Sequence, residues 1–257
     1  MAEHMITVDT ERCIGCGLCK ADCAARNIEI RAQKAVILTP DCVLCGHCAA
    51  ICPRGAVSIS GYGEAPISRD GGRPLDPSQV LDVIRFRRTI RQFQAQDIPS
   101  GVLEQILEAG RLTHTAKNLQ DLSFIVLDRE KAKFEQMAAA LFRRVKPLAN
   151  LFSPMAKRIQ IDDHFFFFHA PKVIVIAAKE EINGCLAAQN MEFVAEAHGL
   201  GVLFSGFFTI AANRSGRLRK ALGIPRGKRV AATLVLGYPK VNYRRSAQRE
   251  ALDVTYL

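Results

Sequence analysis

The chain has 257 residues, of which 49% are hydrophobic and 23% are charged, and its formal net charge is +10 at pH 7. This composition is typical of a soluble globular protein, and no apolar run approaches the length of a membrane span, so we expect no membrane association. A basic surplus can indicate nucleic acid binding, but neither a basic helix nor interleaved basic and aromatic residues supports it, and we expect no nucleic acid partner.

Eight of the nine cysteines form two runs with the same spacing, C-x2-C-x2-C-x3-C, and Pro53 follows the second run. Thiolates are the soft ligands that iron–sulfur clusters require, and this spacing is the bacterial two-cluster signature. The fourth cysteine of such a run reaches the other cluster. We therefore predict two [4Fe–4S] clusters, one held by Cys13, Cys16, Cys19 and Cys52, the other by Cys42, Cys45, Cys48 and Cys23.

Zinc and disulfides are the alternative explanations for these cysteines. Zinc ribbons pair C-x2-C units rather than a triplet followed by a fourth cysteine. Disulfides need an oxidising compartment, and the N-terminus has no apolar signal-peptide core. We therefore favour clusters and expect a cytoplasmic protein. The stretch resembles the bacterial two-[4Fe–4S] ferredoxins, with Ala24 rather than proline after Cys23.

The chain divides into two expected domains. Residues 1–60 carry the cysteine repeat and form the ferredoxin-like domain, with short β-like pieces at Ile6–Val8, Ile28–Ile30, Val36–Leu38 and Val57–Ile59. Residues 61–77 are rich in glycine and proline, which marks a linker. Residues 78–257 then form the second domain.

The second domain is predicted to alternate helices and strands. Helices are expected at Ser78–Arg88, Lys131–Lys146, Leu186–His198 and Ser215–Leu222, with another from Pro99 to Gly110. Strands are expected at Ser123–Leu127, Val173–Ala178 and Val230–Leu236. Pro147 should end the helix before it, because proline lacks an N–H donor. Strands separated by helices predict a sheet covered on both faces. Neither a GxGxxG turn nor a P-loop is present.

A basic segment follows the first helix of this domain. Arg87, Arg88, Thr89 and Arg91 place three guanidiniums and a hydroxyl within five residues. Guanidinium groups make paired, charge-assisted bonds to phosphate, and threonine adds a neutral donor. A solvated basic helix end is the alternative.

The order of short motifs over residues 78–257 resembles the nitroreductase family of FMN proteins. The motifs are Arg87-Arg88-Thr89-Ile90-Arg91, Thr115 to Gln120, His169-Ala170-Pro171 before an apolar strand, Gly199 to Gly206, and Gly237-Tyr238-Pro239 with a distal arginine. Asp121 and Leu122 depart from the family pattern, which usually continues with proline and an aromatic residue.

The resemblance implies an α+β homodimer with FMN in a cleft between the protomers. By position, Arg87, Thr89 and Arg91 would hold the FMN phosphate, with Arg88 as a further candidate. Asn118 and Gln120 would bond the flavin edge, and backbone groups around Ser205 and Gly206 would face the reactive ring edge. Among the tail residues Arg244, Arg245 and Arg249, we favour Arg249 as the arginine that closes on the phosphate. No catalytic side chain is assigned, because the chemistry belongs to the flavin.

The two halves together predict an α+β protein in which a small ferredoxin-like domain precedes a nitroreductase-like domain with a helix-covered sheet. Flavin exchanges electrons singly or as a hydride. We therefore expect an FMN-dependent oxidoreductase that relays electrons through two [4Fe–4S] clusters to FMN and on to a small organic acceptor, such as a nitro compound or a quinone. The expected donor is a one-electron donor such as ferredoxin, or NAD(P)H. Two alternatives stay open: an electron-transfer protein that serves a partner protein, and a substrate-oxidising enzyme that passes electrons out through the clusters.

Overall fold

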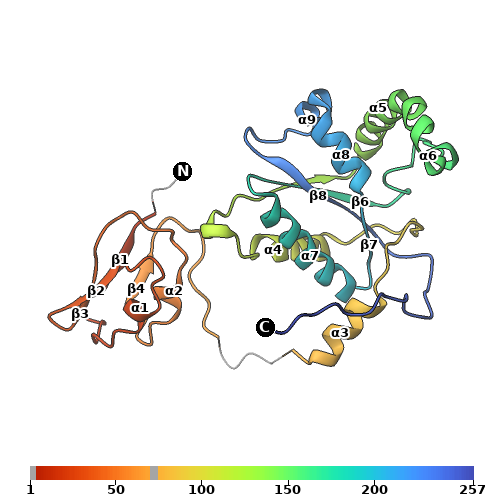
Figure 1. Cartoon of the computed structure of the whole chain (residues 1–257). Helices are drawn as coiled ribbons and strands as arrows, with labels where there is room; N and C mark the ends of the chain where they lie inside the picture. Colours follow the sequence, from red (N-terminus) through yellow and green to blue (C-terminus); the bar gives the residue numbers. More distant parts are fainter. Residues whose placement is uncertain (1–3, 70–74) are drawn as a thin grey trace. The chain divides into compact units, whose positions relative to one another are not determined.

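The computed structural model describes residues 4–69 and 75–257, and this part of the chain divides into two compact units (Figure 1). The first unit holds the described residues of Met1–Pro74 together with Ala116–Leu119, and the second holds Leu75–Thr115 and Gln120–Leu257. Residues 1–3 of the expected ferredoxin-like domain and residues 70–74 of the expected linker lie outside the described residues.

The first unit is built from two antiparallel strand pairs and two short helices. Strand β1 (Ile6–Val8) pairs with β4 (Val57–Ile59), and β2 (Ile28–Arg31) pairs with β3 (Lys34–Ile37). The helices α1 (Leu18–Ala21) and α2 (His47–Ala50) each carry the third cysteine of a run. The core contains few large side chains; its buried members are Cys13, Cys19, Ile28, Ala35, Cys48, Ala56 and Val57.

The second unit contains a four-stranded antiparallel sheet. Its strands are β5 (Ser123–Leu127), β6 (Lys172–Ala178), β7 (Gly201–Phe204) and β8 (Arg229–Gly237), in the spatial order β5-β6-β8-β7. Every residue of β6 is buried. Successive side chains of a strand point to opposite faces of its sheet, so Val173 and Val175 enter one core cluster while Ile174 and Ile176 enter the other.

Helices cover both faces of this sheet, as the alternation of elements predicts. Helices α4 (Ser100–Arg111) and α7 (Glu181–Ala197) contribute Ile106, Ala188 and Met191 to the core on one face. On the other face lie α5 (Lys131–Phe152), α8 (Gly206–Arg214) and α9 (Gly216–Ala221). Helices α3 (Pro77–Phe86) and α6 (Pro154–Arg158) contain no buried residue. Among the described residues, no helix has the length and apolar character needed to cross a bilayer.

Two predicted helix boundaries are wrong. Helix α5 continues through Pro147 to Phe152, since an internal proline removes one backbone hydrogen bond and can bend a helix without ending it. The break comes instead at Ser153, which is extended, as residues before a proline generally are. Helix α7 begins at Glu181 rather than Leu186, because a carboxylate from another part of the chain binds the N–H groups just before it. That carboxylate belongs to Asp121.

Candidate functional site

Two cavities in the first unit each have four cysteines among their lining residues. The first has an empty volume of about 350 Å³ and is lined by Cys13, Cys16, Cys19 and Cys52. The second has an empty volume of about 440 Å³ and is lined by Cys23, Cys42, Cys45 and Cys48. Each cavity therefore joins three cysteines of one run to the fourth cysteine of the other, which is the grouping that the spacing predicts.

Backbone N–H groups point at several of the cysteine sulfurs. The N–H of Asn27 donates to Cys23 Sγ at 3.3 Å, and the N–H of Ala56 donates to Cys52 Sγ at 3.2 Å. Burial alone would raise the pKa of the Cys52 thiol, but backbone N–H groups, that of Ala56 foremost, lower this pKa below its ordinary value of 9.0. Such donors stabilise the thiolate, which is the form that binds iron.

The donor set fits iron–sulfur clusters. Each cavity offers four thiol sulfurs and largely apolar walls, a donor set that suits an iron–sulfur cluster. Among the described residues, no three His, Cys, Asp or Glu side chains converge as a single metal ion would require.

A second, basic site lies in the second unit. Its hollow has an empty volume of about 960 Å³, which includes space open to solvent. The lining residues are Arg87, Arg88, Thr89, Arg91, Gln189, Glu192, Phe204, Tyr243, Ala247 and Arg249. All five residues predicted to hold a phosphate are therefore brought together.

The backbone after α3 explains how the basic segment reaches this hollow. The N–H of Ile90 donates to the carbonyl oxygen of Val202 at 3.1 Å, and the Ile90 side chain is buried. This close approach needs a glycine at position 201, where a Cβ atom would lie 2.4 Å from Cγ1 of Ile90. Thr89 and Arg91 alternate with the buried Ile90 and line the hollow.

Arg87 is already neutralised in this structure. Its guanidinium forms an ion pair with Glu192 of α7, donates to Oε1 of Gln189 at 3.2 Å, and lies 5.3 Å from the centre of the Phe193 ring. The side chains of Arg87 and Glu192 are only 23% and 11% exposed. Burial, and after it the negative charge of Glu192, raise the pKa of the Glu196 carboxyl. The positive charge of Arg87 opposes this rise.

Arg88 has a donor left over. Its Nη1 donates to the carbonyl oxygens of Arg85 and Arg87 at 2.9 and 2.6 Å. Its Nη2 is buried and has no hydrogen-bond partner among the described residues. Buried polar groups are rarely left unpaired, so this atom is evidence that the hollow fits an anionic ligand.

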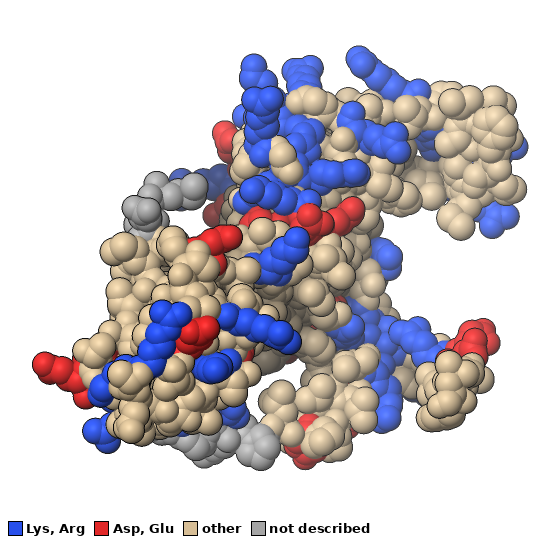
Figure 2. Space-filling model, turned by 60° about the vertical axis from the view of Figure 1, so that its left-hand side comes forward, with Lys and Arg blue, Asp and Glu red and all other residues tan. Residues whose placement is uncertain are grey.

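The basic surplus of the chain extends beyond this hollow. Figure 2 shows Lys and Arg side chains gathered at the top of the view, the level at which Figure 1 places α9. The last turn of α9 carries Arg219 and Lys220.

Of the three candidate tail arginines, Arg249 lines the hollow, whereas Arg244 and Arg245 are not among its described lining residues.

The other predicted flavin contacts do not line this hollow. Asn118 belongs to the first unit, where its Nδ2 donates to the carbonyl oxygens of Val43 and Leu44. The N–H of Gln120 donates to Oγ1 of Thr115 at 2.9 Å. Ser205 precedes the first residue of α8, Gly206, and its hydroxyl donates to the carbonyl oxygen of Phe166 at 3.0 Å.

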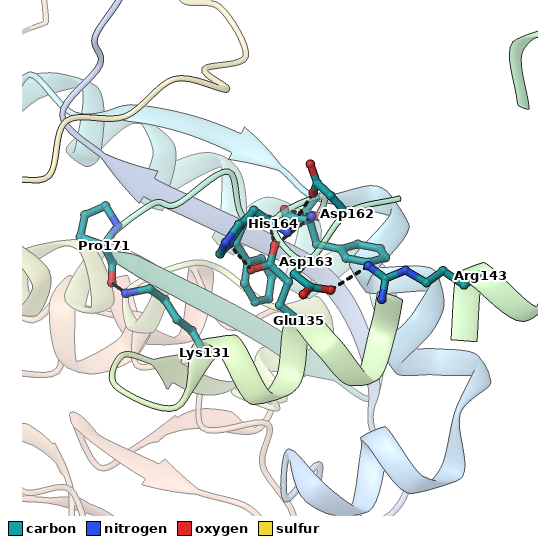
Figure 3. A network of polar contacts seen from close by, with 10 residues as sticks. Lys131, Glu135, Arg143, Asp162, Asp163, His164 and Pro171 are labelled. Carbon is teal, nitrogen blue, oxygen red and sulfur yellow. Dashed lines mark hydrogen bonds and ion pairs between the residues drawn. The ribbon is translucent and has the colours of Figure 1, made fainter. Parts of the chain in front are cut away.

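A buried carboxylate holds the turn to which Ser205 is bonded. Glu135 of α5 accepts the N–H groups of Phe166 and Phe167 on one oxygen, at 3.0 and 2.6 Å, and its other oxygen lies 3.7 Å from Nδ1 of His164 (Figure 3). Burial raises the pKa of the Glu135 carboxyl above its ordinary value of 4.5. Nearby, Arg143 donates to Asp163 at 2.7 Å, and Lys131 donates to the carbonyl oxygen of Pro171 at 2.9 Å.

Sequence reasoning did not identify Gln189 and Glu192. They lie one helical turn apart on α7 and therefore share a face, which is a local signal. However, their partner Arg87 is 105 residues away from Glu192 in the sequence. No local pattern connects the two positions.

Two family comparisons match separate parts of the chain. Residues 84–238 match the family described as the nitroreductase family, and residues 5–53 match the 4Fe-4S dicluster domain. A protein of Archaeoglobus fulgidus, provisionally named NADH dehydrogenase/NAD(P)H nitroreductase, is 31% identical over 164 residues, which cover 63% of this chain and 86% of the relative. The NADH dehydrogenase of Thermus thermophilus is 26% identical over 174 residues, covering 60% and 83% of the two chains.

Solved structures show the same fold. A nitroreductase with bound FMN from Desulfitobacterium hafniense aligns over 70% of this chain and 98% of its own, with a TM-score of 0.57 and 21% identity. The match to the nitroreductase family spans more than half of the chain. The chain therefore belongs to the nitroreductase family of oxidoreductases, and a 4Fe-4S dicluster domain precedes the family's fold in its sequence.

Proposed function

We propose that this protein relays electrons through two [4Fe–4S] clusters to FMN and on to a small organic acceptor, such as a nitro compound or a quinone. One observation carries the proposal: a single chain combines two cavities, each lined by four cysteines, with a basic hollow lined by four arginines. One of these arginines, Arg88, has a buried nitrogen without a hydrogen-bond partner among the described residues. Sites of these two kinds would suit the clusters and the flavin that such a relay requires.

The eight cysteines are the proposed cluster ligands. One cluster takes Cys13, Cys16, Cys19 and Cys52, and the other takes Cys42, Cys45, Cys48 and Cys23. Each set of four cysteines lines its own cavity. This supports the grouping over one in which all four cysteines of a run bind the same cluster.

The basic hollow is the proposed FMN phosphate site. Bound FMN would supply one-electron and hydride chemistry. Arg88, Thr89, Arg91 and Arg249 would bind the phosphate, while Arg87, paired with Glu192, would balance the nearby carboxylate. Solved relatives that contain FMN support this cofactor. Contacts of Gln120, Ser205 and Gly206 with the flavin ring rest on the family resemblance alone.

The proposed working form is a cytoplasmic homodimer, with domains at 1–60 and 78–257 joined by the linker 61–77. Helix α3 supports dimerisation, because it leaves an apolar set exposed: Leu81, Val83, Ile84 and Phe86.

The proposed donor is a reduced ferredoxin or a similar one-electron donor. NAD(P)H is the second possibility, supported by the names of the relatives.

The test is anaerobic reduction of the purified holoprotein with NADH, NADPH and reduced ferredoxin in separate experiments, each followed by a panel of nitroaromatic and quinone acceptors. The proposal expects reduction by at least one donor and rapid reoxidation by a small acceptor. Reoxidation only by a partner protein would favour the electron-transfer alternative. Bleaching by an organic substrate, without any donor, would favour the substrate-oxidising alternative.

A further inference from the structure

A short piece of the nitroreductase-family sequence belongs to the cluster-binding unit. Ala116–Leu119 lies inside the family match at 84–238, yet it belongs to the first unit, while Thr115 and Gln120 belong to the second. Within this piece, Nδ2 of Asn118 donates to the carbonyl oxygens of Val43 at 3.2 Å and of Leu44 at 2.8 Å. Both carbonyls lie in the loop between Cys42 and Cys45.

The internal repeat shows how the first cysteine loop is held. Position 15 corresponds to position 44, since both follow the first cysteine of their run by two residues. The turn between β2 and β3 covers Gly15 so closely that a Cβ there would lie 2.3 Å from the carbonyl oxygen of Gln33. Lys34 also donates to the carbonyl oxygen of Cys13, at 2.6 Å. The first loop is therefore held by its own hairpin.

The second loop is held differently. Leu44 occupies the position of Gly15 and has a φ of 53°, a left-handed conformation that is strained for leucine. Strained residues persist where surrounding contacts determine them. Here the amide of Asn118 contacts the carbonyls on both sides of the Leu44 Cα atom. A side chain from another part of the sequence thus replaces the hairpin support.

The peptide group between Val43 and Leu44 also forms a hydrogen bond with a proposed cluster ligand. The carbonyl of Val43 and the N–H of Leu44 belong to one planar peptide, so a bond that fixes the carbonyl also fixes the N–H. That N–H donates to Cys42 Sγ at 3.4 Å. Hydrogen bonds to cluster sulfurs tune reduction potential, because they stabilise the more negative, reduced state.

We propose that Asn118 is a positioning residue for the second cluster. Its amide holds the Val43–Leu44 peptide so that the N–H stays directed at Cys42 Sγ, and it thereby raises the reduction potential of the cluster bound by Cys42, Cys45, Cys48 and Cys23. This inference rests on the cluster ligands proposed above. It assigns Asn118 to a cluster loop rather than to the flavin edge that the family resemblance implies.

The test is a potentiometric titration of anaerobic holoprotein, followed by electron paramagnetic resonance, for the wild type, Asn118→Ala and the matched control Lys34→Met. Lys34→Met removes the hydrogen-bond donor to the carbonyl oxygen of Cys13, in the first loop. We expect Asn118→Ala to lower one of the two midpoint potentials and Lys34→Met to affect the other. Iron, sulfide and FMN contents are measured on every sample, so a lost cofactor is not mistaken for a shifted potential.

Unchanged potentials in Asn118→Ala would overturn the inference, as would loss of FMN with both cluster potentials unchanged. If Asn118→Ala does not fold, Asn118→Ser serves instead, because its shorter side chain cannot span both carbonyls; the expected shift is the same. Absence of iron from anaerobically purified wild type would overturn the cluster assignment itself, which distinguishes that failure from a failure of the role of Asn118.

Discussion

Glu192 of α7 is ion-paired with Arg87, which directly follows α3, at the wall of the basic hollow. One of the four arginines that line the hollow is therefore charge-balanced before any ligand binds, while Arg88 retains a buried nitrogen without a hydrogen-bond partner among the described residues. Arg87 and Arg91, to which the family resemblance assigns the same phosphate role, consequently have different expected effects when each is replaced.

Replacing Arg91 should weaken flavin binding without disturbing the clusters. Loss of a charged hydrogen bond costs about 1.5–3 kcal/mol, which corresponds to a rise of about 10- to 150-fold in the FMN dissociation constant. Fluorescence titration of Arg91→Ala apoprotein with FMN measures this. Arg85→Ala is the matched control, because Arg85 pairs with the exposed Asp82 and should leave the affinity unchanged. Equal affinities of Arg91→Ala and the wild type would mean that the segment is only a solvated helix end.

Arg87 and Glu192 should respond in opposite directions. Arg87→Ala leaves the Glu192 carboxylate unpaired beside the hollow, so it should both lower the unfolding temperature and weaken FMN binding. Glu192→Gln removes the negative charge that opposes a phosphate, so it should tighten FMN binding. Measuring both variants in one titration series checks the assignment. Weaker binding by Glu192→Gln would show that the ion pair itself shapes the phosphate site.

Single cysteine replacements should test the exchange of ligands between the two runs. Wild-type protein should contain close to eight iron and eight sulfide per chain, since each of the two [4Fe–4S] clusters holds four of each. Cys52→Ser should perturb the cluster of Cys13, Cys16 and Cys19, and Cys23→Ser should perturb the other one. Paramagnetic resonance spectra of the two variants should therefore differ. Stoichiometric zinc without iron would refute the cluster assignment.

Asp121 should stabilise the second unit in a pH-dependent way. Its carboxylate accepts the N–H groups of Lys179 and Glu180 and the side chain of Asn183, at 2.8–2.9 Å. Burial would raise the pKa of Asp121, but these donors outweigh burial and hold it below 3.8. A lowered folded-state pKa gives stability that is present above the ordinary value and lost as pH falls through the folded value.

We therefore expect Asp121→Asn to lower the free energy of unfolding by about 1–3 kcal/mol near neutral pH. The difference from wild type should shrink as the pH falls below 3.8. Urea unfolding of both proteins at each pH measures this difference in the free energy of unfolding. Because the two proteins are compared at the same pH, any loss of clusters affects both. A difference that does not change with pH would contradict the role of the charge.

Glu135 should show the opposite pH dependence. A raised folded-state pKa gives stability that is complete below the ordinary value of 4.5 and is lost as pH rises through the folded value. Glu135→Gln keeps the oxygen that accepts from Phe166 and Phe167 but cannot ionise. Its stability relative to wild type should therefore increase with pH across that window. The same urea series measures this, and a relative stability that decreases with pH would contradict it.

The sequence predicts most of the first unit and much of the second because their signals are local. Cysteine spacing determines which residues can reach one cluster, and the apolar run Val173–Ala178 identifies the buried strand β6. The arginine segment likewise reaches the hollow in one continuous stretch.

Several features that the sequence could not predict depend on contacts between distant residues. The start of α7 is set by Asp121, which lies 58 residues before Lys179. The ion pair of Arg87 with Glu192 and the hydrogen bond from Asn118 to Leu44 likewise join residues that are far apart in the sequence. Asp121 stood out in the sequence only as a departure from the family pattern, and the hydrogen bonds that its carboxylate accepts from Lys179 and Glu180 supply a structural reason for that departure.

Electron transfer from the clusters to the flavin is tested most directly by rapid-mixing reduction of the flavin with reduced ferredoxin. The comparison is wild type against a Cys13→Ser, Cys16→Ser double variant that is verified to be folded and loaded with FMN. We expect flavin reduction by ferredoxin to slow sharply in the variant, while flavin reduced directly by dithionite still reacts with the acceptor at the wild-type rate. Equal rates of ferredoxin-driven flavin reduction in the two proteins would contradict an obligatory path through this cluster.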